Sequence, residues 1–300
     1  MHKLQMLGGV VAFVLGVAAN QAGAQVMNPA DAARKSATEA ESKQVLPDSR
    51  YRSWEYPPIE VVGIKLREED RIGSYQQPRW TATRRFTTTR VYVVPEGKME
   101  FEYWIRATRQ KDGRMDYRSL WEVEFGLPHR FQLDFYMRTD QKGANSEMVQ
   151  AEQIELRYAL ADWGVIPGNP TLYFEWIRKE EDPDVLEPKI LFGGEIVPRW
   201  HWGLNLVGEF ELSGDREYEY SARAGVSYSL IDSKFALGIE GIYAMTDTKE
   251  DRGNFEKSFV IGPSIQCKPV PQMTINVTPM FGVTGDSPES QTWFNVGWEL

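Results

Sequence analysis

Apolar and polar residues alternate along the chain from about residue 99 to the C-terminus. Between residues 131 and 138, for example, every second residue is apolar: Phe131, Leu133, Phe135 and Met137. A period of two predicts β-strands that have one apolar and one polar face. We identify about twelve such segments, with about fourteen as the alternative count, which begin near residues 99, 115, 130, 151, 170, 188, 201, 217, 234, 257, 272 and 291.

These segments and the links between them predict a transmembrane barrel. Each segment has about ten residues, the length of a tilted strand that crosses a bilayer. Links that we expect to be short, such as Gly126–His129 and Gly164–Asn169, alternate with longer polar links such as 139–149, an asymmetry of outer-membrane barrels. We therefore predict an all-β fold, a transmembrane antiparallel up-and-down β-barrel over residues 99–300 with its polar face inside. A soluble β-sandwich or soluble barrel, with its apolar face inside, is the alternative.

Aromatic residues support the membrane interpretation. Four tryptophans, Trp163, Trp200, Trp202 and Trp298, fall near the expected short turns, where we expect an aromatic girdle. The last segment, 291–300, ends the chain with alternating apolar and aromatic residues and resembles the C-terminal signature of bacterial outer-membrane proteins, although it ends in Leu rather than Phe or Trp.

Two prolines interrupt this regular pattern. Pro263 and Pro279 fall inside two neighbouring expected strands, where each removes a hydrogen-bond donor from the sheet. We expect a bulge or kink at this place, or strand limits that differ from those given above.

The N-terminus has the features of a secretory signal. A short basic start, Met1–Lys3, precedes an almost wholly apolar run, Met6–Ala19, and then Ala22-Gly23-Ala24. The apolar run is short for a membrane helix, and the small residues fit an A-x-A cleavage site. We expect cleavage after Ala24 and export to the bacterial outer membrane.

Residues 25–98 form an N-terminal extension that we place on the periplasmic side. Asn28 and Pro29 suit the start of a short helix that extends to about Gln44. Four arginines, Arg79, Arg84, Arg85 and Arg90, make the end of the extension basic. Our hypothesis is that this part docks in the acidic interior as a plug; the alternative is a periplasmic segment with solvated arginines.

Charge and composition exclude several classes of function. The formal net charge is −9, which argues against nucleic-acid binding because that function needs a basic face. The single cysteine, Cys267, rules out an intrachain disulfide. His129 and His201 remain after loss of the signal, and we assign them to turns or interfaces on the periplasmic side. We expect no metal site, no cofactor and no catalytic residues.

Charged residues on the polar faces are our candidates for the lining of the lumen, because charges there cannot face hydrocarbon cheaply. They are Glu100, Glu102, Arg106, Arg118, Glu122, Glu124, Asp134, Arg138, Glu155, Arg157, Glu175, Glu195, Glu209, Arg223 and Glu240. Two interpretations remain open. One is an interior closed by salt bridges; the other is a selective pore whose acidic excess favours cationic or neutral solutes.

One strand-turn-strand unit resembles a known family. Residues 122–133, EVEFGLPHRFQL, resemble the E-x-E-x-G-L-t-x-R-x-x-L unit common in barrels related to the MetA-pathway phenol-degradation family, with Pro-His where that family often has Thr-Asp. The resemblance covers one hairpin. It implies an outer-membrane channel for small organic compounds.

We therefore predict an outer-membrane channel for passive passage of small solutes through a narrow, charged lumen. The expected partners are outer-membrane lipid, lipopolysaccharide and a small-molecule solute, and the pattern leaves the oligomeric state open. The alternatives are a closed structural or adhesion barrel and a barrel-embedded enzyme.

Overall fold

The computed structural model describes residues 67–143, 146–180 and 182–300. The expected signal peptide, its cleavage site and the short helix lie outside the described residues. No helix within the described residues has the length and apolar character needed to cross a membrane. Two short 3₁₀ turns are present, η1 (Arg79–Thr81) and η2 (Pro128–Arg130).

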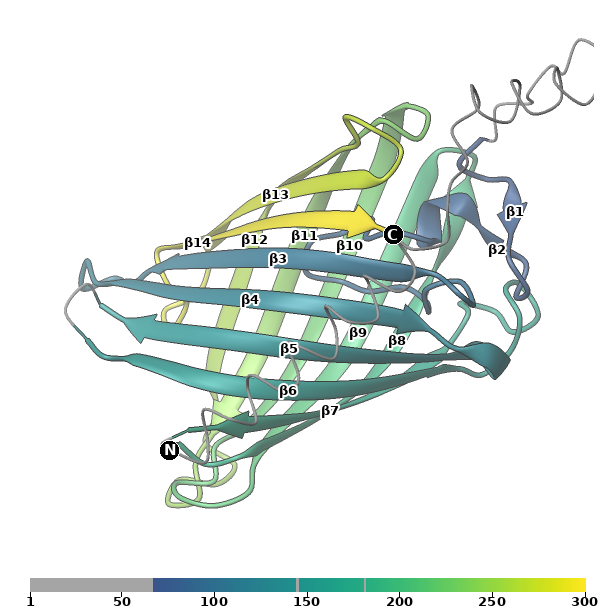
Figure 1. Cartoon of the computed structure of the whole chain (residues 1–300). Helices are drawn as coiled ribbons and strands as arrows, with labels where there is room; N and C mark the ends of the chain where they lie inside the picture. The colour runs from purple at the N-terminus through teal and green to yellow at the C-terminus, as the bar shows by residue number, and fades with distance from the viewer. Residues whose placement is uncertain (1–66, 144–145, 181) are drawn as a thin grey trace, which may run out of the picture. The chain divides into compact units, whose positions relative to one another are not determined.

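Twelve antiparallel strands close into a barrel (Figure 1). They are β3 (Met99–Arg109), β4 (Met115–Gly126), β5 (Phe131–Lys142), β6 (Met148–Ala159), β7 (Thr171–Lys179), β8 (Val185–Val197), β9 (Trp200–Glu211), β10 (Tyr218–Ile231), β11 (Phe235–Asp247), β12 (Glu256–Cys267), β13 (Met273–Gly282) and β14 (Ser290–Glu299). Each begins within three residues of its predicted start. The predicted fold class and strand count are confirmed.

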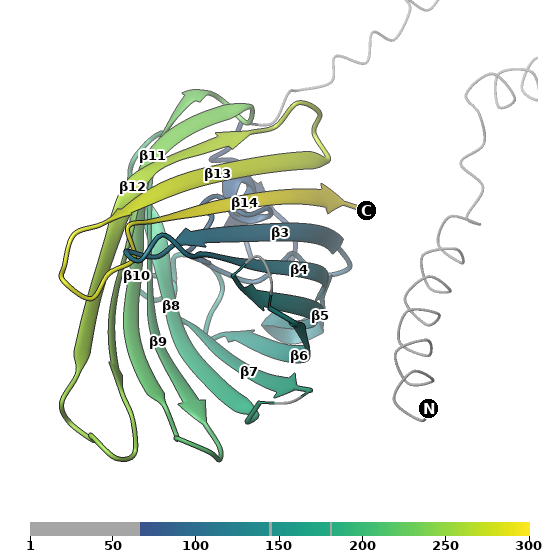
Figure 2. The same cartoon turned by 90° about the vertical axis from the view of Figure 1, so that its left-hand side faces the viewer.

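Each strand pairs with its neighbours in sequence, and the last strand closes the ring on the first. Figure 2 shows β14 beside β3, where Asn295 pairs with Trp104 and Trp298 with Phe101. Closure matters because it leaves no unpaired strand edge. A separate two-stranded pair, β1 (Arg71–Ile72) and β2 (Gln77–Pro78), precedes the barrel.

Most apolar side chains of the strands point outward and most charged ones inward. On β7, Phe174 and Trp176 are exposed, whereas Tyr173 and Glu175 between them are buried. The same alternation appears on β6, where Ile154 is exposed and Glu155 is fully buried. This pattern is opposite to that of a soluble barrel, so the soluble alternative is wrong.

The link between β6 and β7 corrects one expectation. It spans residues 160–170 rather than the short turn predicted over 164–169. The reason is that this link packs against the segment before the barrel: the Trp163 N–H donates to the Tyr75 carbonyl oxygen (2.9 Å). Trp163 is also only 8% exposed, so it belongs to that contact and not to an aromatic girdle, whereas Trp200 and Trp298 are exposed as expected.

The two prolines interrupt one ladder without ending a strand. Ile261 pairs with Phe281 and Ile265 with Val277 in one unchanged register, and residues 262–264 between them have no paired partner on β13. Pro263 and Pro279 lie in this gap on opposite strands. The missing donors therefore leave a local gap in pairing rather than the expected bulge.

The outward apolar face predicts a cost for a charge placed at mid-strand. We expect Ile154→Arg to lower the free energy of unfolding in lipid by about 2–4 kcal/mol, because the guanidinium would face hydrocarbon at mid-depth. The measurement is urea unfolding of the protein refolded into lipid vesicles.

Met148→Arg is the matched control, since Met148 is exposed on the same face at the end of β6. Its cost should lie below about 1 kcal/mol. Equal effects of the two substitutions would contradict the placement of this face in lipid.

Candidate functional site

A segment without regular secondary structure, residues 82–98, is held by inward side chains of the barrel. Such a segment cannot pair its own backbone groups, so it needs other partners when it is buried. Phe86 and Val93 in this segment are completely buried. We call residues 79–94, which include η1, the inner segment.

Polar side chains of the strands supply the missing backbone partners. Glu240 on β11 accepts hydrogen bonds from the N–H groups of Thr87 (2.9 Å) and Thr88 (2.7 Å). Asn205 on β9 accepts from the Arg90 N–H (2.9 Å) and donates to the Arg90 carbonyl oxygen (2.6 Å). These bonds hold the inner segment from β9 and β11 at once.

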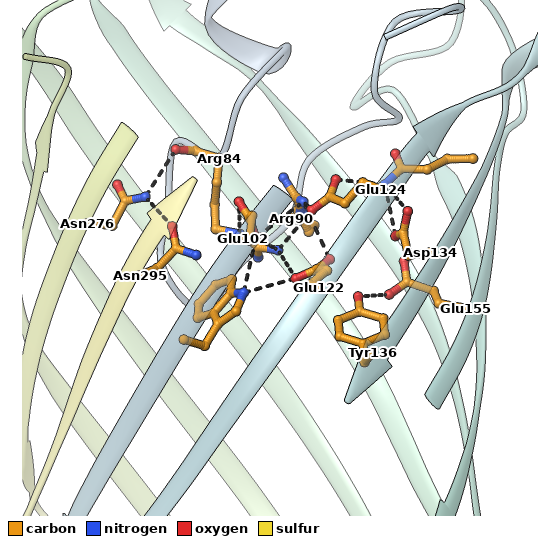
Figure 3. Close-up of polar contacts among 12 residues, drawn as sticks. Arg84, Arg90, Glu102, Glu122, Glu124, Asp134, Tyr136, Glu155, Asn276 and Asn295 are labelled. Carbon is orange, nitrogen blue, oxygen red and sulfur yellow. Dashed lines mark hydrogen bonds and ion pairs between the residues drawn. The ribbon is translucent and has the colours of Figure 1, made fainter. Parts of the chain in front are cut away.

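Further amides do the same on other strands. Gln132 on β5 accepts from the Val94 N–H (2.6 Å). The Arg84 carbonyl oxygen accepts from Gln266 on β12 and from Asn276 on β13, and Figure 3 shows the Asn276 contact. The inner segment is therefore bonded to strands on several sides of the barrel.

Two arginines of the inner segment enter a cluster of carboxylates on β3 and β4 (Figure 3). Arg84 donates to both oxygens of Glu102 (3.2 and 2.9 Å) and lies 3.5 Å from Glu122. Arg90 forms an ion pair with Glu124. These groups are at most 10% exposed. Such burial requires pairing, because an unpaired buried charge is costly.

Neighbouring groups extend this cluster along the wall. The Trp104 indole N–H donates to Glu122 (2.9 Å), and the Arg84 guanidinium lies 4.0 Å from the Trp104 ring centroid. On β5 and β6, Arg157 contacts both Asp134 (3.1 Å) and Glu155, and Tyr136 donates to Glu155. The wall thus carries two neighbouring groups of paired charges, one on β3 and β4 and one on β5 and β6.

The third arginine of the inner segment has a different partner. Arg85 donates to Glu68 (2.8 Å) and Ser229 (3.0 Å). Nearby, the Trp80 indole N–H donates to Glu195 (2.7 Å), and its ring lies 4.5 Å from the buried ring of His201. Arg79, the fourth predicted arginine, bonds through its backbone N–H to the Asp70 carbonyl oxygen (3.0 Å).

An aromatic group anchors the end of the inner segment. Tyr92 and Trp80 both pack edge-on against Trp163, with ring centroids 5.2 and 5.7 Å apart. Burial raises the pKa of the Tyr92 hydroxyl, so this group stays protonated and donates to the Ala161 carbonyl oxygen (2.6 Å).

Three inward glycines make room for the inner segment. Gly193, Gly203 and Gly225 are paired side by side across β8, β9 and β10. A Cβ on Gly225 would lie 2.7 Å from the Phe86 ring, and one on Gly193 would clash with Val91. Because glycine has no side chain, these three positions leave room for Phe86 and Val91 of the inner segment to pack directly against the backbone of the wall.

The predicted lumen candidates fall into two groups. At most 7% exposed are Glu100, Glu102, Glu122, Glu124, Asp134, Arg138, Glu155, Arg157, Glu175 and Glu240. Partly exposed are Arg106, Arg118, Glu195, Glu209 and Arg223. Both groups lie on inward faces; that they line a conducting pore stays a prediction.

Sequence reasoning missed the neutral partners. It singled out charges and passed over Gln132, Asn205, Gln266 and Asn276, as well as Glu68, which precedes the barrel. Gln132 and Asn205 stand on the same inward faces as the predicted charges Asp134 and Glu209, so strand parity was the signal that could have identified them.

Two carboxylate groups have the spacing to hold a cation. They are Glu100, Glu102 and Glu124, and Glu122, Asp134 and Glu155. Arginine side chains already contact both groups, so protein cations neutralise them and the donor set gives no reason to add a metal.

Comparison with known proteins finds the same kind of fold in solved outer-membrane β-barrels. The structure is similar to that of the COG4313 outer membrane channel from Pseudomonas putida F1, with a TM-score of 0.53, 9% identity, and coverage of 70% of this chain and 97% of that chain. It also matches the KdgM porin in complex with disordered oligogalacturonate (TM-score 0.46, 11% identity, 67% and 97%) and the NanC porin (0.45, 13%, 66% and 97%).

No family model and no curated protein matches the sequence. The likeness to the Pseudomonas channel therefore shows the fold, a Gram-negative outer-membrane type of β-barrel. The link to the phenol-degradation family remains the resemblance of one hairpin.

The bonds of Glu240 predict how the inner segment can be released. We expect Glu240→Ala to leave the N–H groups of Thr87 and Thr88 without partners, at about 1–3 kcal/mol each. Trypsin should then cleave after Arg84, Arg85 and Arg90 at least about tenfold faster. Mass spectrometry of timed digests of the folded protein measures these cleavages.

Glu256→Ala is the control, because Glu256 lies exposed on the neighbouring strand β12. It should leave the digest unchanged. Equal cleavage of wild type and Glu240→Ala would mean that Glu240 does not hold the inner segment.

Proposed function

We propose that this protein is an outer-membrane channel for passive passage of small solutes through a narrow, charged lumen. The observation that carries the proposal is the closed barrel of twelve strands with apolar side chains outside and charged side chains inside. A charged interior is expected where water or a solute passes, since a filled soluble core is apolar. The likeness of the fold to that of an outer-membrane channel supports the same proposal.

The orientation follows from chain connectivity. β3 and β14 meet at the end of the barrel where residues 67–98 precede the first strand. In outer-membrane barrels the chain ends lie on the periplasmic side. We therefore place residues 67–98 in or below the periplasmic mouth and the links between β3 and β4, and between β11 and β12, outside.

The inner segment is the proposed plug. Its side chains and backbone bond to inward residues of β3, β4, β5, β9, β11, β12 and β13. A segment bonded to so many strands occupies space that a solute would need. Passage through the lumen then requires movement of the inner segment.

The same contacts favour a second candidate, a barrel that stays closed and serves a structural or adhesive role. The two functions differ in whether the inner segment moves. A barrel-embedded enzyme is the third, separate hypothesis, and an assay of lipid hydrolysis tests it.

Planar-bilayer recording distinguishes the channel from the closed barrel. We expect wild type to show small or rare conductance steps and Glu240→Ala to show more frequent steps, because the inner segment is held less firmly. Deletion of residues 25–90 should give the largest and most constant conductance.

Folding of each variant is checked by the heat-dependent shift in electrophoretic mobility, and Glu256→Ala again serves as the control. Conductance that deletion leaves unchanged would reject the plug. Absence of current from the folded deletion variant would reject the channel and favour the closed barrel.

A further inference from the structure

Three inward arginines stand beyond the residues of β3, β4 and β5 that bond the inner segment, toward the other end of the barrel. Arg106 on β3, Arg118 on β4 and Arg138 on β5 occupy three adjacent strands, and Arg106 pairs directly with Arg118 across β3 and β4. Like charges placed opposite each other destabilise a sheet. Their presence therefore calls for an explanation other than stability. We call these three residues the arginine row.

The arginine row is incompletely neutralised. Asp140 accepts from Arg118 (2.6 Å) and also from Arg138. Among the residues that the structure describes, Arg106 has no carboxylate within ion-pair distance, and its guanidinium lies 5.2 Å from the ring centroid of Trp293. Two of the three guanidinium groups thus share one carboxylate and the third has none, whereas Arg84 and Arg90 share Glu102, Glu122 and Glu124.

Solvent reaches Arg106 and Arg118 of the arginine row. Arg106 is partly exposed and the side chain of Arg118 is 26% exposed, whereas that of Arg138 is only 7% exposed. Glu102 and Glu124 beside the inner segment are 0% exposed. An arginine in an accessible lumen keeps its donors available for a dissolved anion. The planar guanidinium fork matches the geometry of a carboxylate.

The opposite wall carries a charge that is already paired. Glu209 on β9 accepts a hydrogen bond from Arg223 (2.9 Å). Opposite charges at this distance largely cancel, so Glu209 competes little for the guanidinium of Arg106.

An indole ring adjoins the free arginine. Trp293 on β14 pairs with Arg106 across the two strands and is partly exposed. Its other side packs edge-on against the buried Trp104, with ring centroids 6.4 Å apart. An apolar group attached to the carboxylate can rest against the Trp293 ring.

We propose that the arginine row and Trp293 form a binding site for a small organic monocarboxylate, with Arg106 as its principal anion ligand. This site rests on the proposed channel function and names the class of solute that the channel selects. It differs from the preference for cationic or neutral solutes that the acidic composition predicts, because most of the inward carboxylates near the inner segment are already paired with arginines.

Benzoate is the probe and benzyl alcohol its uncharged counterpart. Isothermal titration with the full chain refolded in detergent should show benzoate binding to wild type. Arg106→Gln should weaken that binding at least about tenfold, the loss expected for one charge-assisted hydrogen bond. Arg106→Lys keeps the charge without the fork and should fall between the two. Benzyl alcohol should bind more weakly than benzoate and should not distinguish these proteins.

Arg178→Gln is the matched control, because Arg178 is exposed on the outward face of β7. It should bind benzoate as wild type does. Loss of Arg106 breaks no ion pair, so we expect the variant to fold, and Arg118→Gln provides a second variant that should also weaken binding. Benzoate binding that neither substitution changes would overturn the site.

Conductance gives an independent outcome. In the same proteins, Arg106→Gln should lower the anion-to-cation permeability ratio measured from the reversal potential in a salt gradient. If the protein conducts but Arg106→Gln changes neither the permeability ratio nor the benzoate affinity, the site is refuted and the channel function stands. A protein that binds benzoate through Arg106 and never conducts, even without residues 25–90, would refute the channel and leave the site.

Discussion

Glu240 accepts hydrogen bonds from two consecutive backbone N–H groups, those of Thr87 and Thr88, inside the barrel. This pairing illustrates the constraint on which the structure depends. A stretch of chain without helix or strand can be buried only when other groups satisfy its backbone. Here inward carboxylates and amides of the strands do so, which means that the barrel wall acts as the hydrogen-bonding partner that a second strand would otherwise provide.

The same constraint governs the charges. Glu102, Glu122 and Glu124 are fully buried on two adjacent strands, an arrangement that repulsion would forbid without cations. Arg84 and Arg90 of the inner segment provide them. Removal of either partner of such a buried pair is strongly destabilising, by about 3–5 kcal/mol. The inner segment and the wall around it therefore stabilise each other. If the inner segment moves away, water or ions must take the place of its arginines beside the carboxylates of the wall.

The sequence predicted the barrel well, because the strand pattern is local. Parity assigned Glu155 to the inside and Ile154 to the outside, and the positions of the strand starts followed from the same alternation. The alternation of side chains along a strand cannot predict which residue of another segment each inward side chain contacts. Nothing near Glu240 in sequence indicates that it bonds to Thr87. The role of Asn205 likewise depends on Arg90, which is 115 residues away in the sequence. The long link at 160–170 was misjudged for the same reason, since its length is explained by contacts of Trp163 with Tyr75 and Trp80.

The interior divides into two parts with different electrostatics. Beside the inner segment, the carboxylates are dry and most of them contact an arginine, so much of their negative charge is cancelled over short distances. Around Arg118 and Asp140, the groups are accessible to solvent and the arginines outnumber their carboxylate partner. In the channel that we propose, a solute that arrives from the outer side meets the second region before the first. Net charge summed over the chain therefore describes selectivity poorly: the acidic excess includes carboxylates that arginines of the same chain already occupy, and the field that a solute meets depends on the few charges left unpaired.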